Sequence, residues 1–186
     1  MTHPLCHIAV DAIAGVLRDG ERREPDLTML HPTFTDTGAS FVTLEREGQL
    51  LGCVGSLEPR RPLALDVAQH AIEAAFDDPR VPPITPEDFK AMSVKVSVLS
   101  RSEPIAANSF ADLRVRVRPG VDGITVTAAS RRATFLPSVW DKVRDVDEFL
   151  GALWLKAGLR PGTWPAGMTV ERYTTTEFTD RGPRDF

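Results

Sequence analysis

The 186-residue chain is poor in cysteine and has no long apolar run. Its two cysteines, Cys6 and Cys53, cannot form a disulfide framework, and no C-x-x-C pair indicates a metal or redox site. A reducing cytoplasm is therefore the expected compartment. No stretch of about 18 apolar residues occurs, so we predict no membrane span. Residues 1–4 lack the basic region of a signal peptide.

Common catalytic and nucleotide-binding motifs are also missing. There is no Walker A loop, no G-x-G-x-x-G after an expected strand, no H-E-x-x-H and no G-x-S-x-G. No histidine pair on an expected helix has ligand spacing, and His3 and His7 straddle Pro4 near the start of the chain. We therefore expect no metal site, and the sequence indicates no cofactor.

The net charge of the chain further limits the functions to be expected. The 22 basic and 26 acidic residues give a net charge of −4, which argues against general nucleic-acid binding. Of the basic residues, 18 are Arg and only 4 are Lys. The arginines reflect either a GC-rich genome or guanidinium recognition of carboxylates and phosphates. Because the net charge is not positive, we favour the compositional interpretation.

Apolar spacing and turn residues predict a mixture of helices and strands. Helices are expected at 5–19, from Pro62 to about Asp78, after Thr85, and after a cap at Asp145 or Asp147. Strands are expected at 41–44, 50–54, 93–100, 124–128, 133–136 and within 169–178. The segment 109–117 stays open, because Ser109 is typical of a helix cap whereas Val115 and Val117 alternate as in a strand. Without a regular βαβ rhythm, we predict an α+β fold whose sheets are largely antiparallel and flanked by helices.

Cys53 is the first candidate for chemistry. It stands in the run Gly52-Cys53-Val54-Gly55, and glycines inside a strand indicate close approach of another backbone or a ligand. A nucleophilic thiol needs a base within reach, and His31 or His70 could supply one only if the fold brings it close. The alternative is a buried cysteine that packs as a small apolar residue.

Three turns supply further candidates. Arg60-Arg61 precedes an expected helix start and Arg131-Arg132 lies at a hairpin turn, so each pair is either solvated turn charge or part of an anion site. Asp122 is either a turn residue bonded to its own backbone or an acid at a pocket rim.

Several ordered segments resemble one family. Residues 51–57, L-G-C-V-G-S-L, resemble the L-R-G-C-I-G-[ST] hallmark of the AMMECR domain family. The similarity continues through the following segments: 74–80 (A-A-F-D-D-P-R), 94–99 with 103–105 (E-P-I), 119–124 (P-G-V-D-G-I), 134–140 (T-F-L-P-S-V-W), and 149–159 with Arg172-Tyr173. It covers residues 5–178, which we take as a single AMMECR-like domain followed by a C-terminal tail at 179–186.

The resemblance implies an α+β fold with a larger and a smaller lobe, and it assigns no reaction. Bacterial members are called AmmeMemoRadiSam system protein A, because they are encoded beside a Memo-like protein and a radical SAM enzyme. Leu51 stands where the family has Arg, Val81 where it has Phe, and Ser138 where it has Gln. An anion-binding role of that Arg therefore does not transfer to position 51.

We therefore expect a cytoplasmic accessory or binding component that acts with a Memo-like protein and a radical SAM enzyme. Its pocket would be centred on Cys53, with these residues as candidates for the lining and rim: Gly52, Cys53, Gly55, Arg80, Asp122 and Arg131. The alternatives are an enzyme that uses the Cys53 thiolate on a small-molecule or peptide substrate and, less favoured, a nucleic-acid-binding regulator. Thiol reactivity separates the first two hypotheses.

Overall fold

The structure is a computed structural model that describes residues 3–184. The chain divides into two compact units of unequal size. The first comprises the residues up to Leu99 together with those from Thr176 onward, and the second comprises Ser100–Thr175. Each unit has its own hydrophobic core of buried residues.

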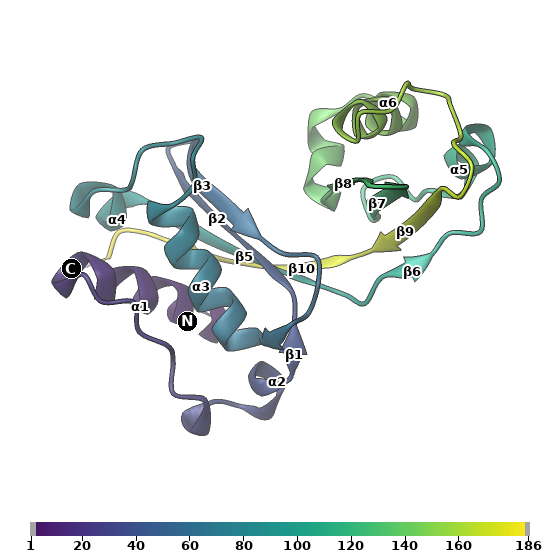
Figure 1. Ribbon diagram of the computed structural model, residues 1–186. Helices are drawn as coiled ribbons and strands as arrows, with labels where there is room; N and C mark the ends of the chain where they lie inside the picture. Colours follow the sequence, from purple (N-terminus) through teal and green to yellow (C-terminus); the bar gives the residue numbers. More distant parts are fainter. Residues whose placement is uncertain (1–2, 185–186) are drawn as a thin grey trace. The chain divides into compact units, whose positions relative to one another are not determined.

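The first unit holds two long helices on one side of a sheet (Figure 1). Its helical elements are α1 (Pro4–Asp19), η1 (Leu27–Met29), α2 (Pro32–Thr35), α3 (Leu63–Phe76) and α4 (Pro86–Ala91). Helix α1 ends at Gly20, whose φ of 79° places it in the left-handed region that glycine adopts without strain. Thr85 and Asp88 form a capping box at the start of α4, which confirms the helix expected there.

The main sheet of this unit is four-stranded, in the order β10-β5-β2-β3. Its strands are β2 (Ser40–Arg46), β3 (Gln49–Gly55), β5 (Ser93–Leu99) and β10 (Thr175–Arg181). The short strands β1 (Thr37–Gly38) and β4 (Arg61–Pro62) form a separate pair. The β2–β3 hairpin turns at Glu47 and Gly48, both at positive φ, where the sequence predicts a turn.

One face of this sheet is apolar and the other is mixed. Val42, Leu44, Val94 and Val96 are fully buried in the core beneath α1 and α3. Residues between them in sequence project to the opposite face, because side chains alternate along a strand. Thr43 therefore shares that opposite face with its partners in register, Cys53 of β3 and Lys95 of β5.

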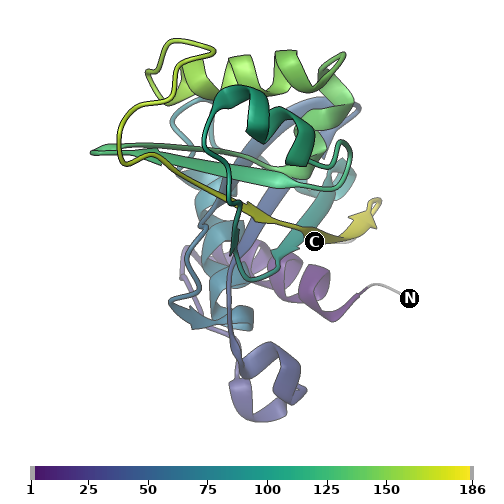
Figure 2. The same cartoon turned by 90° about the vertical axis from the view of Figure 1, so that its right-hand side faces the viewer.

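The second unit also packs helices on an antiparallel sheet, with the strand order β6-β9-β7-β8. Its elements are β6 (Glu103–Pro104), α5 (Phe110–Arg116), β7 (Gly123–Ala128), β8 (Arg131–Phe135), η2 (Pro137–Lys142), α6 (Val146–Lys156) and β9 (Thr169–Tyr173). Figure 2 shows α6 lying along one face of this sheet. The pairings in both units are antiparallel, which confirms the predicted α+β class.

The open segment 109–117 is a helix. Ser109 accepts a hydrogen bond from the backbone N–H of Asp112, which satisfies one of the unpaired donors of the first turn. Leu113 is fully buried, whereas Val115 is 79% exposed. The valine alternation therefore indicated a strand wrongly: Leu113 is buried in the core of the unit, and Phe110 of the same helix packs against it.

Residues up to Arg184 make contacts with the first unit. Strand β10 continues to Arg181, three residues into the segment expected as a tail. The Arg184 guanidinium then donates to the carbonyl oxygens of Phe89 (3.0 Å) and Met92 (2.7 Å) and pairs with Asp180. Residues 185 and 186 of the predicted tail lie outside the described residues.

Across the described part of the chain, none of the helices combines the length and the hydrophobicity needed to cross a membrane.

Candidate functional site

Cys53 lies on β3, the edge strand of the first unit's main sheet. Its partner in register is Thr43 of β2, and the Thr43 Oγ1 atom is 3.2 Å from the Cys53 Sγ atom. The side chains of both residues lie on the sheet face opposite to α1 and α3. Cys53 is half-buried, unlike Cys6, which is fully buried in the core.

The backbone of Cys53 is held by the segment that follows α3. The Asp78 carboxylate accepts the Cys53 N–H at 3.0 Å, and the Arg80 guanidinium donates to the Cys53 carbonyl oxygen at 2.8 Å. These groups occupy the outward-facing donor and acceptor of an edge strand, where a further strand would otherwise pair. The motif that contains Cys53 and the D-P-R segment are therefore one structural element.

Asp78 and Arg80 also bind each other. Arg80 donates to Asp78 from its backbone N–H (3.1 Å), its Nε (2.9 Å) and its Nη2 (2.7 Å). These hydrogen bonds, led by those from the guanidinium, hold the pKa of Asp78 well below its usual range despite burial. The pKa of Arg80 is raised, chiefly by Asp78 and further by the Cys53 side chain beside it.

The surroundings of the thiol are polar. Lys95 of β5 is the second register partner of Thr43, so Cys53, Thr43 and Lys95 form a row across three strands. The row ends at Glu177 of β10, whose Oε2 atom is 3.8 Å from the Lys95 Nζ atom and whose Oε1 atom accepts from the Ser97 hydroxyl at 3.2 Å. Within residues 3–184, no hydrogen bond joins the Cys53 Sγ atom to a histidine or a carboxylate.

The two predicted histidine bases have other positions. His31 caps α2 by accepting the backbone N–H of Thr33. His70 is buried on α3, where its Nδ1 atom is 3.2 Å from Asp66. The thiol therefore has a hydroxyl and a cation beside it, but neither of the histidines that sequence reasoning offered as a base.

The two glycines beside Cys53 are explained by packing. A Cβ atom on Gly52 would lie 1.8 Å from the carbonyl oxygen of Ala74, so this glycine lets α3 approach β3 closely. A Cβ atom on Gly55 would lie 2.3 Å from the Phe41 ring. Both glycines border the candidate site: Gly52 leaves room for α3 on the core side of the sheet, and Gly55 leaves room for Phe41, which shares the opposite face with Thr43.

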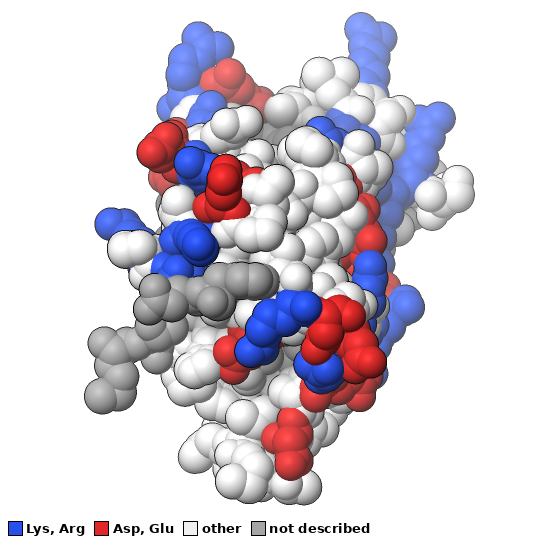
Figure 3. Space-filling view, turned by 90° about the vertical axis from the view of Figure 1, so that its left-hand side faces the viewer, with Lys and Arg blue, Asp and Glu red and all other residues white. Residues whose placement is uncertain are grey.

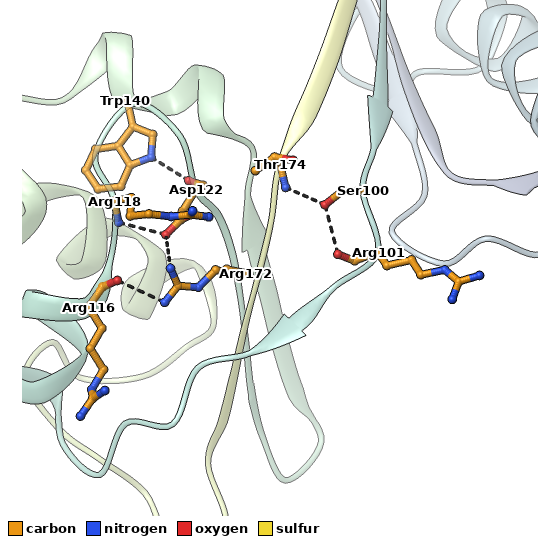
Figure 4. Close-up of polar contacts among 8 residues, drawn as sticks. All are labelled: Ser100, Arg101, Arg116, Arg118, Asp122, Trp140, Arg172 and Thr174. Carbon is orange, nitrogen blue, oxygen red and sulfur yellow. Dashed lines mark hydrogen bonds and ion pairs between the residues drawn. The ribbon is translucent and has the colours of Figure 1, made fainter.

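Asp122 belongs to the second unit and is fully buried there (Figure 4). Its carboxylate accepts from the Arg118 backbone N–H and guanidinium, at 2.6 to 2.9 Å, and lies 3.3 Å from Arg172. Its carbonyl oxygen accepts the Trp140 indole N–H at 2.7 Å. Asp122 thus closes its own turn, as one of the two interpretations predicts, and it also joins that turn to β9 and η2.

The paired arginines at turns bind neighbouring groups. Arg131 donates to the Gly158 carbonyl oxygen at 2.6 Å, beyond the last turn of α6, where a cation is favourable. Arg60 pairs with Glu58, and the Arg61 Nε atom is 3.7 Å from Asp66. Each of these three arginines has a carbonyl or carboxylate partner within its own unit.

The structure therefore brings together four of the predicted site residues: Gly52, Cys53, Gly55 and Arg80. Asp122 and Arg131 make separate sets of contacts in the other unit. Sequence reasoning missed Asp78 and Thr43. The D-P-R segment contained the signal for Asp78, but its contact with Cys53 spans 25 residues and no local pattern reveals it.

Two cavities of the first unit lie elsewhere. One of about 210 Å³ is lined by α3 and residues 22–24, and one of about 500 Å³ by α1 and residues 23–30. Cys53 lines neither of them.

The fold and the site define a class: a two-unit α+β protein with a half-buried cysteine on an edge strand clamped by an Asp–Arg pair. The AMMECR1 family model matches residues 6–178. The chain therefore belongs to the AMMECR1 family.

Several relatives match this chain over most of its length. A protein of Methanothermobacter thermautotrophicus is 41% identical over 163 residues, which cover 84% of this chain and 82% of the relative. A protein of Thermotoga maritima is 34% identical and covers 95% of this chain and 97% of its own length. The crystal structure of uncharacterized protein PH0010 from Pyrococcus horikoshii matches with a TM-score of 0.88 and 31% identity, covering 98% of this chain and 92% of that one. These similarities confirm the fold, and the names of these relatives state no activity.

Proposed function

We propose that the protein is a binding component whose recognition site is the sheet face around Cys53. The observation that carries the proposal is the half-buried Cys53 thiol, which lies 3.2 Å from the Thr43 hydroxyl on a residue whose carbonyl oxygen binds the Arg80 guanidinium. The Thr43 hydroxyl and the Lys95 ammonium, which lie in the same row across the sheet, can donate hydrogen bonds to a ligand. The family resemblance suggests the partners: a Memo-like protein and a radical SAM enzyme in the cytoplasm.

The test is association with those partners. The chain and the Memo-like protein of the same genome are mixed and followed by size-exclusion chromatography and calorimetry, with the radical SAM enzyme in a parallel series. Cys53→Ser and Thr43→Val are expected to weaken the association at least tenfold. Cys6→Ala, which alters a buried cysteine away from this face, is the matched control. Equal affinities for the three variants and the parent would exclude a recognition role for Cys53.

A thiolate enzyme is the second candidate. The Thr43 hydroxyl lies 3.2 Å from the Cys53 sulfur, within hydrogen-bonding distance of a reacting thiol. Within residues 3–184 the Cys53 sulfur has no histidine or carboxylate partner, which favours binding over catalysis. Alkylation with iodoacetamide decides: a nucleophilic Cys53 reacts much faster than a small-molecule thiol near neutral pH, whereas a binding residue reacts at or below that rate.

Nucleic-acid binding is less favoured. In the lower part of the face shown in Figure 3, basic and acidic side chains stand against one another. The ion pairs Arg22–Asp77 and Arg23–Asp19 of the first unit show the same local neutralisation. Filter binding at low salt is expected to give no retention, and strong retention that falls with salt would reverse this ranking.

A further inference from the structure

Two histidines of the first unit occupy equivalent positions. His3 precedes Pro4 at the start of α1, and His31 precedes Pro32 at the start of α2. In each case the imidazole Nδ1 atom accepts the backbone N–H two residues later, from Leu5 or from Thr33, at 3.3 Å. The His31 Nδ1 atom also lies 2.9 Å from the Thr33 hydroxyl.

These hydrogen bonds require neutral rings. An Nδ1 atom accepts only when it carries no proton, so both caps need an imidazole with its hydrogen on Nε2. A protonated ring would point a donor at a backbone donor and place a cation at the positive end of a helix. Each cap therefore fails when its histidine is protonated.

The two caps meet at one aromatic ring. Phe34 of α2 lies edge-on to His3 (ring centroids 6.0 Å apart) and to His31 (6.2 Å). His3 also stacks on Phe178 of β10, with centroids 3.6 Å apart and planes 10° from parallel. The cluster of His3, His31, Phe34 and Phe178 thus joins the starts of two helices to an edge strand.

We propose that this cluster is an acid-sensitive contact. It holds the starts of α1 and α2 against β10 at neutral pH and releases them when both histidines are protonated. The proposal is independent of the function proposed for Cys53.

The charged groups on α1, α2 and β10, which pack around the cluster, do not reverse the expected destabilisation by acid. Along α1, Asp11 is already paired with His7 at 2.9 Å, and beside β10 Asp180 is paired with Arg184 at 2.7 Å and Glu177 lies near Lys95. Asp36 follows α2 and closes it through its backbone. The Phe178 face would attract a cation, but burial lowers the pKa of His3, so the neutral ring is favoured on balance.

The sign of the effect follows from linkage. A histidine whose pKa is lower in the folded state than in the unfolded chain costs no stability above the unfolded value of about 6.5, and stability is lost as the pH falls below it.

The test replaces both caps with a residue that accepts but does not titrate. Asparagine is among the best N-cap residues, so the His3→Asn/His31→Asn variant is expected to remain folded. Denaturant unfolding is measured at about pH 7.5 and pH 5.5 for the parent and this variant. Relative to the double variant, the parent is expected to lose about fivefold in its folding constant per cap on acidification.

Two local measurements complete the test on the parent protein. Nitrogen NMR shifts at neutral pH are expected to show the Nε2–H tautomer for His3 and His31. Hydrogen exchange of the Leu5 and Thr33 amides is expected to accelerate at the lower pH beyond the intrinsic change. Equal acid sensitivity of parent and double variant, or unchanged protection of these amides, would overturn the proposal.

Discussion

Replacing Asp78 with Asn tests whether the clamp on the Cys53 strand holds through its charge. Asp78 accepts the Cys53 N–H and three N–H groups of Arg80, at 2.7 to 3.1 Å. Asparagine is nearly the same size, but its amide NH₂ would face a donor from Cys53 or from Arg80. The substitution therefore removes the charge and leaves one donor facing another.

The expected cost is about 2–3 kcal/mol. A hydrogen bond to a charged group contributes about 1.5–3 kcal/mol, and a buried donor left unsatisfied costs about 1–3 kcal/mol. The Arg80 side chain is 60% exposed, so water recovers part of what the guanidinium loses. We therefore place the estimate below the roughly 3–5 kcal/mol of a fully buried pair that loses one partner.

The neighbouring residue supplies a matched control. Asp77 also binds a guanidinium through both oxygens, that of Arg22, but its side chain is 43% exposed. Asp77→Asn is expected to cost less than about 1 kcal/mol, because exposed ion pairs contribute little. Urea unfolding of the two variants and the parent measures the difference. Equal costs for the two substitutions would refute the reasoning from burial.

The same contacts predict a dependence on pH. Because the pKa of Asp78 is held below its unfolded value of about 3.9, its contribution to stability is present above that pH and is lost as the pH falls through it. The parent is expected to lose its advantage over Asp78→Asn as the solution is acidified below about pH 4. A constant difference between the two proteins down to about pH 2 would contradict this assignment of the charge.

Three further predictions concern the glycines, the second unit and the thiols. Gly52→Ala is expected to lower the unfolding free energy by more than about 3 kcal/mol, because its Cβ would overlap the α3 backbone. The control Gly151→Ala in α6 places its Cβ in open space and is expected to be neutral or stabilising by up to about 1 kcal/mol. Urea titrations measure both variants. Asp122→Asn is expected to cost about 2–4 kcal/mol, measured by thermal unfolding, since it leaves two guanidiniums around a neutral buried amide. Burial raises the pKa of the Cys6 thiol to about 11, so Ellman's reagent is expected to modify Cys53 alone in the native protein and both thiols only after unfolding.

Local chemistry made much of the fold predictable. The helix stop at Gly20, the turn at Gly48 and the capped start at Thr85 depend on the backbone preferences of a few adjacent residues. The segment 109–117 shows the limit of such signals. Its alternating valines indicate a strand, but the Ser109 cap and the burial of Leu113 make it a helix.

The contacts of the site were predictable only in part. The Cys53 motif and Arg80 were both candidates, yet nothing local indicates that Arg80 donates to the Cys53 carbonyl from 27 residues away. Nor does the sequence show that Asp122 is shared between Arg118 and Arg172. Long-range partners depend on which strands and turns the fold brings together.

These contacts show which residues around Cys53 have a structural role. Gly52 and Gly55 are required because α3 and Phe41 leave no room for a side chain. Asp78 and Arg80 satisfy the edge of β3 through the Cys53 backbone, which any residue except proline could supply. The thiol of Cys53 takes no part in this backbone pairing, and its recorded contact is the Thr43 hydroxyl 3.2 Å away. A half-buried thiol beside a hydroxyl, on a strand whose edge is already satisfied, is where binding or chemistry is to be sought.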